Sequence, residues 1–262
     1  MGDPVLWEID RRGVGTVTLN RPHVNNAYNG DLLQGLHDAM DALGRDKGLR
    51  TVVLRGNGRH FQAGADLAWI LSVAAQSPAE NERASRLTAE AVRRLDTCAV
   101  PTLALVQGGC FGGGTGIAAA CDVVVASEDA VFSISETRWG LMAGVILPQL
   151  CHAIGLRQAR RYALTGERFG AEEARRIGLV HEVCPTGGLE TAGARIVDSI
   201  LMNAPGTTTA TKRRMLSAAG ALVDDADLRD LIEEHALARQ SDEAREGLAS
   251  FMEKRKAAWY PG

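Results

Sequence analysis

Short apolar runs and helix-like spacings alternate along the first half of the chain. Residues 14–20 alternate apolar and polar side chains after a turn that ends at Gly13, which predicts a hairpin with residues 5–10. From Asn29 onward, apolar side chains recur every three or four positions, as on the buried face of a helix. By the same patterns we expect strands at 51–55, 102–106, 123–126 and 131–134, and helices at 78–97 and 117–120.

The pattern becomes mainly helical after about residue 145. Helices are expected at 156–164, 171–177, 193–203, 208–219 and 227–256, with one strand-like piece at 179–183. A chain of 262 residues is long for one domain and short for two. We therefore predict an α/β core over residues 1–200 and a helical C-terminal extension over residues 201–262.

Composition narrows the choice of partners. The formal net charge of −3, from 29 basic and 32 acidic residues, favours neither nucleic acid nor an anionic membrane as a partner. The five cysteines are scattered without a CxxC pair, and the six histidines lack metal-binding spacing. Residues 1–10 lack the features of a signal peptide, and no apolar run is long enough to span a bilayer. We expect a cytoplasmic protein without a metal site.

The first segment that suggests chemistry, residues 56–67, follows a predicted strand and leads into a helix. Its Ala63, Gly64 and Ala65 lack bulk, so their backbone N–H groups can face a ligand. The start of a helix adds partial positive charge at the same place. The alternative is a plain turn from strand to helix.

The second segment, residues 107–117, has the same context and places three glycines in a row at 112–114. Glycine loses much backbone freedom on folding, so close packing or a ligand on the amides must offset this cost. The GxGxxA pattern that begins at Gly114 matches a dinucleotide fingerprint. We reject dinucleotide binding, because Val106 ends the strand too early and the next helix is too short for a βαβ crossover.

Glu136 directly follows a predicted strand and lies among apolar residues. A carboxylate in such surroundings can have a raised pKa and act as an acid or a base. The alternative is a solvated loop glutamate paired with Arg138.

Taken in order, several segments resemble the crotonase (enoyl-CoA hydratase/isomerase) superfamily over nearly the whole chain. They are TVTLNRPHVNNAYN, GNGRHFQAGADL, PTLALVQGGCFGGGTGIAAACDVVVAS, FSISETRWGL, ALTGERFGAEEARRIGLVHEV and FMEKRKAAW. The resemblance implies an α/β, crotonase-like fold of repeated ββα units with a helical C-terminal region that serves trimerisation and covers the active site. It also implies acyl-CoA substrates, a homotrimer or a dimer of trimers, and no cofactor, since coenzyme A is part of the substrate.

The resemblance also implies roles for particular residues. Ala63 and Gly113 would donate backbone N–H groups to the thioester oxygen as it becomes an enolate, and Glu136 would exchange the α-proton. The residues expected to bind the substrate and its coenzyme A are His23, Val24, Asn25, Ala63, Gly64, Ala65, Asp66, Leu67, Gly112, Gly113, Gly116, Trp139 and Gly144.

One position departs from the two-glutamate hydratases of the superfamily. Gly116 stands where they carry the glutamate that activates water, whereas the single-glutamate isomerases keep their base at the position of Glu136. The chain also resembles bacterial 3-methylglutaconyl-CoA and isohexenylglutaconyl-CoA hydratases, although residues 142–148 depart from their pattern. We therefore expect Gly116 to leave room for a branched acyl group.

The favoured hypothesis is an enoyl-CoA hydratase-like lyase, with a branched glutaconyl-type ester as one candidate substrate. A single-base enoyl-CoA isomerase is the first alternative. A non-catalytic acyl-CoA-binding or scaffold protein is the second.

Overall fold

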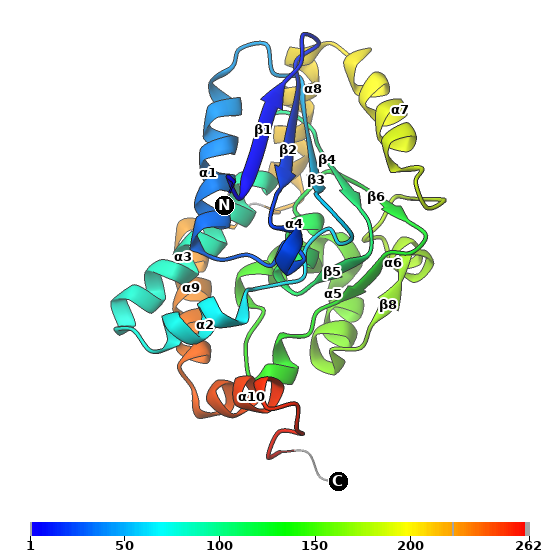
Figure 1. The fold of residues 1–262 in the computed structure, drawn as a ribbon. Helices are drawn as coiled ribbons and strands as arrows, with labels where there is room; N and C mark the ends of the chain where they lie inside the picture. Colours follow the sequence, from blue (N-terminus) through cyan, green and yellow to red (C-terminus); the bar gives the residue numbers. More distant parts are fainter. Residues whose placement is uncertain (1, 222, 260–262) are drawn as a thin grey trace.

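A six-stranded sheet forms the centre of the molecule (Figure 1). The computed structural model describes residues 2–221 and 223–259. The strands are ordered β1 (Val5–Ile9), β2 (Val14–Leu19), β3 (Thr51–Gly56), β4 (Thr102–Val106), β6 (Val123–Ser127) and β9 (Glu182–Cys184). Only β1 runs antiparallel to its neighbour, as the predicted hairpin requires, and the other pairs are parallel.

A smaller sheet lies beside the first and carries the glycine-rich segments. It contains β5 (Gly109–Phe111), β7 (Val131–Ser133) and β8 (Phe169–Gly170). Gln62 forms an isolated bridge to Cys110 in β5, and this bridge joins the first glycine-rich segment to the second. The two segments therefore lie next to each other, although about fifty residues separate them in the sequence.

Helices cover both faces of the large sheet. The helices of the described chain, some of which lie away from the sheet, are α1 (Gly30–Arg45), α2 (Leu67–Ala74), α3 (Pro78–Asp96), α4 (Gly113–Ala119), α5 (Leu147–Thr165), α6 (Ala171–Ile177), α7 (Leu189–Leu201), α8 (Pro205–Ala218), α9 (Asp225–Arg239) and α10 (Asp242–Met252). Three short 3₁₀ helices are η1 (Pro22–Val24), η2 (Glu136–Trp139) and η3 (Gly144–Ile146). The main core joins one face of the sheet to helices that include α1, α3 and α4. A second cluster joins the other face to α7.

Local sequence explains where the first long helices begin. The Asn29 side chain accepts a hydrogen bond from the Leu32 N–H and caps α1. Ser77 and Glu80 form a reciprocal capping box at the start of α3, next to Pro78 in the first turn. These caps agree with the helix starts that the sequence predicts.

The predicted α/β class with a helical C-terminal region is confirmed, but three element predictions need correction. Residues 227–256 form two helices, because Ser241 accepts a hydrogen bond from the Ala244 N–H and starts α10. Helix α5 begins at Leu147, earlier than expected, and bends at Gly155, whose φ is 72°. The glycine-rich loop contains β5 and the first half of α4, which begins at Gly113. In the described part of the chain, no helix is long and apolar enough to cross a membrane.

Candidate active site

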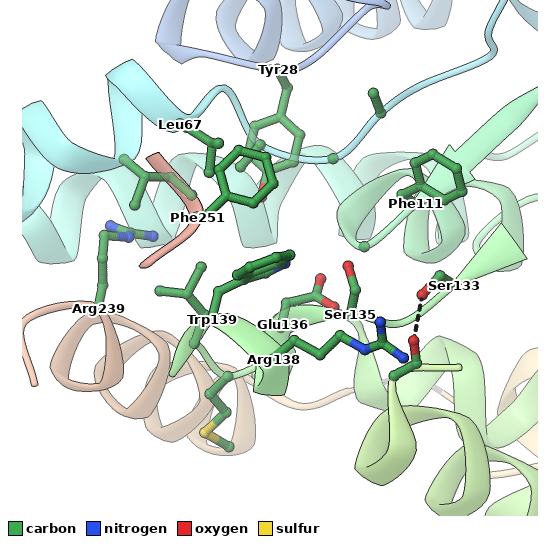
Figure 2. A pocket seen from close by; sticks show the side chains of 18 of the residues that line it. Tyr28, Leu67, Phe111, Ser133, Ser135, Glu136, Arg138, Trp139, Arg239 and Phe251 are labelled. Carbon is green, nitrogen blue, oxygen red and sulfur yellow. Dashed lines mark hydrogen bonds between the residues drawn. The ribbon is translucent and has the colours of Figure 1, made fainter. Parts of the chain in front are cut away.

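A cavity of about 290 Å³ opens where the two glycine-rich segments, η2 and the C-terminal helices meet (Figure 2). Its lining comes from many parts of the chain. The residues are Tyr28, Ala63, Gly64, Ala65, Leu67, Trp69, Ile70, Phe111, Gly112, Ser133, Ser135, Glu136, Arg138, Trp139, Leu141, Met142, Gly166, Arg168, His235, Arg239 and Phe251.

Glu136 is the only carboxylate among the described residues of this lining. It begins η2, just after β7, and its carboxylate lies against Gly112. A Cβ at Gly112 would come within 2.7 Å of Glu136 Oε1, and Gly112 has a φ of 52°, so glycine is needed at this approach. A residue without a side chain therefore lets the carboxylate reach the second glycine-rich segment.

The electrostatics of Glu136 suit proton transfer near neutral pH. Its Oε2 is buried and accepts no hydrogen bond from the described residues. Burial raises the pKa of Glu136 to about 7, against smaller lowering by the backbone N–H groups of Glu136 and Ser135. Arg138 is exposed and forms no ion pair with Glu136 in the described structure, so the alternative of a solvated Glu136–Arg138 pair is wrong.

The first glycine-rich segment presents a different amide from the expected one. The Ala63 N–H donates a hydrogen bond to the Asn25 carbonyl at 3.1 Å, so it is not available to a ligand. Tyr28 bridges the backbone on both sides of Ala65, since the Tyr28 N–H donates to Gly64 and the Tyr28 carbonyl accepts from Asp66. This pairing turns the Ala65 N–H away from Tyr28. The Ala65 N–H donates a hydrogen bond to no described residue. The structure thus supports Ala65, rather than Ala63, as the donor in this segment.

The second expected donor, Gly113, follows Gly112 of the lining but does not itself line the cavity, and its role stays a prediction. Gly113 is the first residue of α4, and its N–H has no hydrogen-bond acceptor in the described part of the chain. A Cβ there would lie 2.6 Å from Cε1 of Tyr28, so the α4 start and the Tyr28 ring pack in direct contact. Gly113 therefore combines an N–H group without an acceptor and close packing against the Tyr28 ring.

The two segments expected to hold coenzyme A lie side by side, and only the second of them, at residues 63–67, contributes to the cavity lining. His23, Val24 and Asn25 form η1 and its C-terminal cap and do not line the cavity. The Asn25–Ala63 hydrogen bond ties this turn to residues 63–67. Asp66 is already engaged, because it caps α2 and pairs with Arg21 at 3.1 Å.

Among the other expected residues, Leu67, Gly112 and Trp139 line the cavity, whereas Gly116 and Gly144 do not. Gly116 faces Ile146, and a Cβ at Gly116 would lie 2.2 Å from Ile146 Cγ2. The expectation that Gly116 leaves room for a branched acyl group is therefore wrong, because Ile146 fills that space.

Sequence reasoning missed several groups in the cavity wall, above all Tyr28, Arg239 and Phe251. Tyr28 is buried and meets Trp69 edge-on at 5.8 Å, and burial raises the pKa of its hydroxyl. Tyr28 directly precedes Asn29, where the sequence predicts the start of a helix, and this position could have marked Tyr28 as a buried residue. Arg239 and Phe251 carry no local signal, because their position depends on how the C-terminal helices fold back over η2.

The comparisons with known proteins agree with this geometry. A family model described as enoyl-CoA hydratase/isomerase matches residues 10–261. The chain belongs to the enoyl-CoA hydratase/isomerase family. The predicted crotonase-like fold is confirmed as well. The crystal structure of an enoyl-CoA hydratase from Mycobacterium avium superposes with a TM-score of 0.87, at 32% identity, covering 99% of this chain and 100% of that one.

Relatives within the family differ in the reaction that their names give. A mitochondrial Delta(3,5)-Delta(2,4)-dienoyl-CoA isomerase from Dictyostelium discoideum is 31% identical over 96% of this chain and 89% of its own length. A hydroxycinnamoyl-CoA hydratase-lyase from Pseudomonas fluorescens is 32% identical over 76% of this chain and 74% of its own length. Membership in this family of enzymes therefore leaves the reaction open, and the narrower resemblance to glutaconyl-CoA hydratases stays a prediction.

Proposed function

We propose that this family member is an enoyl-CoA hydratase-like lyase in which Glu136 is the acid and base. The observation that carries the proposal is the carboxylate of Glu136, buried beside the start of α4, with a pKa of about 7. A carboxyl group with such a pKa is present in both protonation states at neutral pH, so it can accept a proton and return it.

The geometry supports an enolate mechanism. The thioester oxygen of an enoyl-CoA would accept hydrogen bonds from the N–H groups of Ala65 and Gly113, which stabilise the charge that develops there. In the dehydration direction, Glu136 removes the α-proton, and the enolate forms. The β-hydroxyl then leaves as water with the proton from Glu136, and the C=C bond forms. Hydration is the reverse of these steps.

A single-base isomerase is the second candidate, and Gly116 favours it. Gly116 supplies no carboxylate, and Glu136 is the only acid that the described lining contains. One base suffices for isomerisation, since Glu136 removes a proton from one carbon of the enoyl thioester, which leaves a dienolate, and then returns the proton to another carbon.

Product mass separates the two reactions. A panel of enoyl-CoA thioesters is incubated with the enzyme, and the products are analysed by mass spectrometry and by loss of the conjugated thioester absorbance. Addition of one water supports the lyase, and double-bond migration without a change of mass supports the isomerase. Silence across the panel, together with retained acyl-CoA binding, would favour a non-catalytic binder.

The first prediction concerns Glu136→Gln, which removes the proton-transfer group and keeps the shape of the side chain. We expect kcat to fall by about two to four orders of magnitude, while a saturated acyl-CoA still binds. Glu233→Gln, on the exposed side of α9, is the matched control and should keep wild-type kcat. Turnover near the wild-type rate in Glu136→Gln would exclude the assigned role.

We further propose that the protein acts in the cytoplasm as a homotrimer or a dimer of trimers, with no cofactor besides the coenzyme A of its substrate. The large apolar side chains that a single chain leaves exposed, such as Met202 and Leu164, support an assembly. Light scattering on the purified protein tests the number of chains.

A further inference from the structure

One charged group in the cavity wall has no part in the proposed proton transfer. Arg239, the last residue of α9, is only 4% exposed and lines the cavity with Tyr28 and Trp69. Within residues 2–221 and 223–259, no carboxylate forms an ion pair with it. Burying an ionised group without an opposite charge is costly, so a ligand that supplies that charge would offset the cost.

Two neighbours hold the guanidinium in one position. Nη1 of Arg239 donates a hydrogen bond to Oδ1 of Asn81 at 2.7 Å. The Asn81 side chain is itself fixed, because its Nδ2 donates to the Ala236 carbonyl at 2.6 Å and the residue is 1% exposed. Asn81 lies on α3, so the contact locks α3 and α9 together around the charged group. A pre-positioned guanidinium loses little freedom when it binds a ligand.

The adjacent histidine leaves this wall positive. His235 Nδ1 lies 3.2 Å from Nη2 of Arg239 and 3.0 Å from the Ser85 hydroxyl. Arginine can only donate, so Nδ1 accepts and the ring proton of the neutral imidazole lies on Nε2. Burial, and then the charge of Arg239, lower the pKa of His235 to about 3. His235 is therefore neutral at pH 7, and it neither repels an anion nor neutralises Arg239.

The other arginines of the lining differ from Arg239. Arg138 and Arg168 are exposed, and Arg168 lies over the Phe111 ring at 5.3 Å. In Figure 2, Arg239 enters from the side of the cavity away from Arg138, with Trp139 between them in that view. Water screens the exposed arginines, whereas Arg239 acts in a largely apolar wall, where a charge interaction is stronger.

We infer that Arg239 binds a carboxylate at the far end of the acyl group, so that the substrate class is an enoyl-CoA whose chain ends in a second, free carboxylate. This inference rests on the proposed function. A guanidinium matches a carboxylate with two parallel hydrogen bonds, and the N–H groups not used by Asn81 and His235 remain for it. The inference places the specificity for such chains on Arg239 rather than on Gly116 or Arg138.

The test compares two acyl groups of equal length, glutaconyl-CoA, which ends in a carboxylate, and 2-pentenoyl-CoA, which ends in a methyl group. We expect the wild-type kcat/KM to favour glutaconyl-CoA by about tenfold or more. Arg239→Met removes the charge and keeps an unbranched side chain. It should lower kcat/KM for glutaconyl-CoA by about 100-fold and change that for 2-pentenoyl-CoA by less than about threefold. Arg138→Met is the matched control and should affect both substrates alike.

Binding of the saturated analogues separates this inference from the proposed function. Calorimetry compares glutaryl-CoA with pentanoyl-CoA on the wild type, Arg239→Met and Arg239→Lys. A preference for glutaryl-CoA that Arg239→Met loses and Arg239→Lys partly keeps supports the inference, even if no thioester is turned over. Equal binding of the two analogues by the wild type would overturn it, whether or not Arg239→Met folds. An equal loss with both analogues in a folded Arg239→Met protein would also overturn it.

Discussion

Glu136 combines a buried carboxylate oxygen with a role that, in the proposed mechanism, requires the carboxyl group to ionise. Its Oε2 accepts no hydrogen bond from the described residues, and the surroundings favour the neutral form. The same property that places the pKa near neutrality makes the folded protein less stable when Glu136 is ionised. The proposed catalytic use of Glu136 and the stability of the folded protein therefore oppose each other at this residue.

The second prediction is a stability difference that depends on pH. The pKa of Glu136 is raised from the ordinary value of 4.5 to about 7 by folding, so the unfolded chain loses this proton first as the pH increases. Between these two pKa values the folded state binds more protons, and its stability falls with rising pH. The stability of Glu136→Gln does not fall in this way, because glutamine has no carboxyl proton to lose. We expect the variant to gain about 2–3 kcal/mol relative to wild type between pH 5 and pH 8.

Urea unfolding of both proteins at the two pH values measures this difference. Other titrating groups are common to the two proteins, so their contributions cancel. The Glu233→Gln protein serves as the control, since an exposed glutamate should show no such dependence. A difference between Glu136→Gln and wild type that does not change with pH would mean that Glu136 ionises freely in the folded protein.

The sequence points to Ala63 as the N–H donor to the thioester oxygen, whereas the structure favours Ala65. This difference shows the limit of sequence reasoning at a single residue. The run Ala63-Gly64-Ala65 indicates that backbone amides lie open, but three amides compete for the role. Pairing with Tyr28 decides which N–H faces outward, and this partner lies more than thirty residues earlier. Only the folded chain contains that information.

At the scale of helices and strands, elements with local signals were predicted well. The start of α1 follows from Asn29 and the start of α3 from Ser77 and Glu80, because caps lie within a few residues of the groups they bind. Strands β5 and β8 have only three and two residues, and distant pairing alone stabilises them. Such strands leave no periodic pattern, so β5 and β8 do not follow from the sequence, whereas β7 agrees with the strand expected at 131–134.

The third prediction tests the packing of α4 against η3. A Cβ at Gly116 would lie 2.2 Å from Cγ2 and 2.4 Å from Cβ of Ile146. Gly116→Ala should therefore destabilise the protein by about 1–3 kcal/mol. Ile146→Ala alone should cost about 2–5 kcal/mol by leaving a cavity. In the double variant the new methyl group occupies part of that cavity, so the total cost should be less than the sum of the single costs.

Gly206→Ala in α8 is the control for the helical glycine, because its added Cβ would meet nothing within 4 Å. It should leave stability unchanged or raise it by up to about 1 kcal/mol. Urea unfolding measures all four variants. Strict additivity of Gly116→Ala and Ile146→Ala would show that the two residues do not compete for one space.

At the scale of the whole molecule, the C-terminal helices complete a cavity whose proposed catalytic groups lie earlier in the chain. Helix α9 contributes His235 and Arg239 to the lining, and α10 contributes Phe251. Phe251 meets the Trp139 ring edge-on at 4.6 Å, and Trp139 ends the short helix that begins with Glu136. The position of α10 therefore affects both the size of the cavity and the segment that carries Glu136, the proposed base.

The fourth prediction uses a close approach of α10 to that segment. A Cβ at Gly247 would lie 2.3 Å from the carbonyl carbon and oxygen of Trp139, so Gly247→Ala must move α10 away from η2. We expect stability to fall by about 1–3 kcal/mol. We also expect KM to rise, because Phe251 and Trp139 no longer close the cavity together.

The control is Arg245→Ala on the exposed side of the same helix, which should change stability by less than about 0.5 kcal/mol and leave KM unchanged. Steady-state kinetics and urea unfolding on the same preparations separate the two effects. A fall in stability with an unchanged KM would show that α10 supports the fold without shaping the cavity.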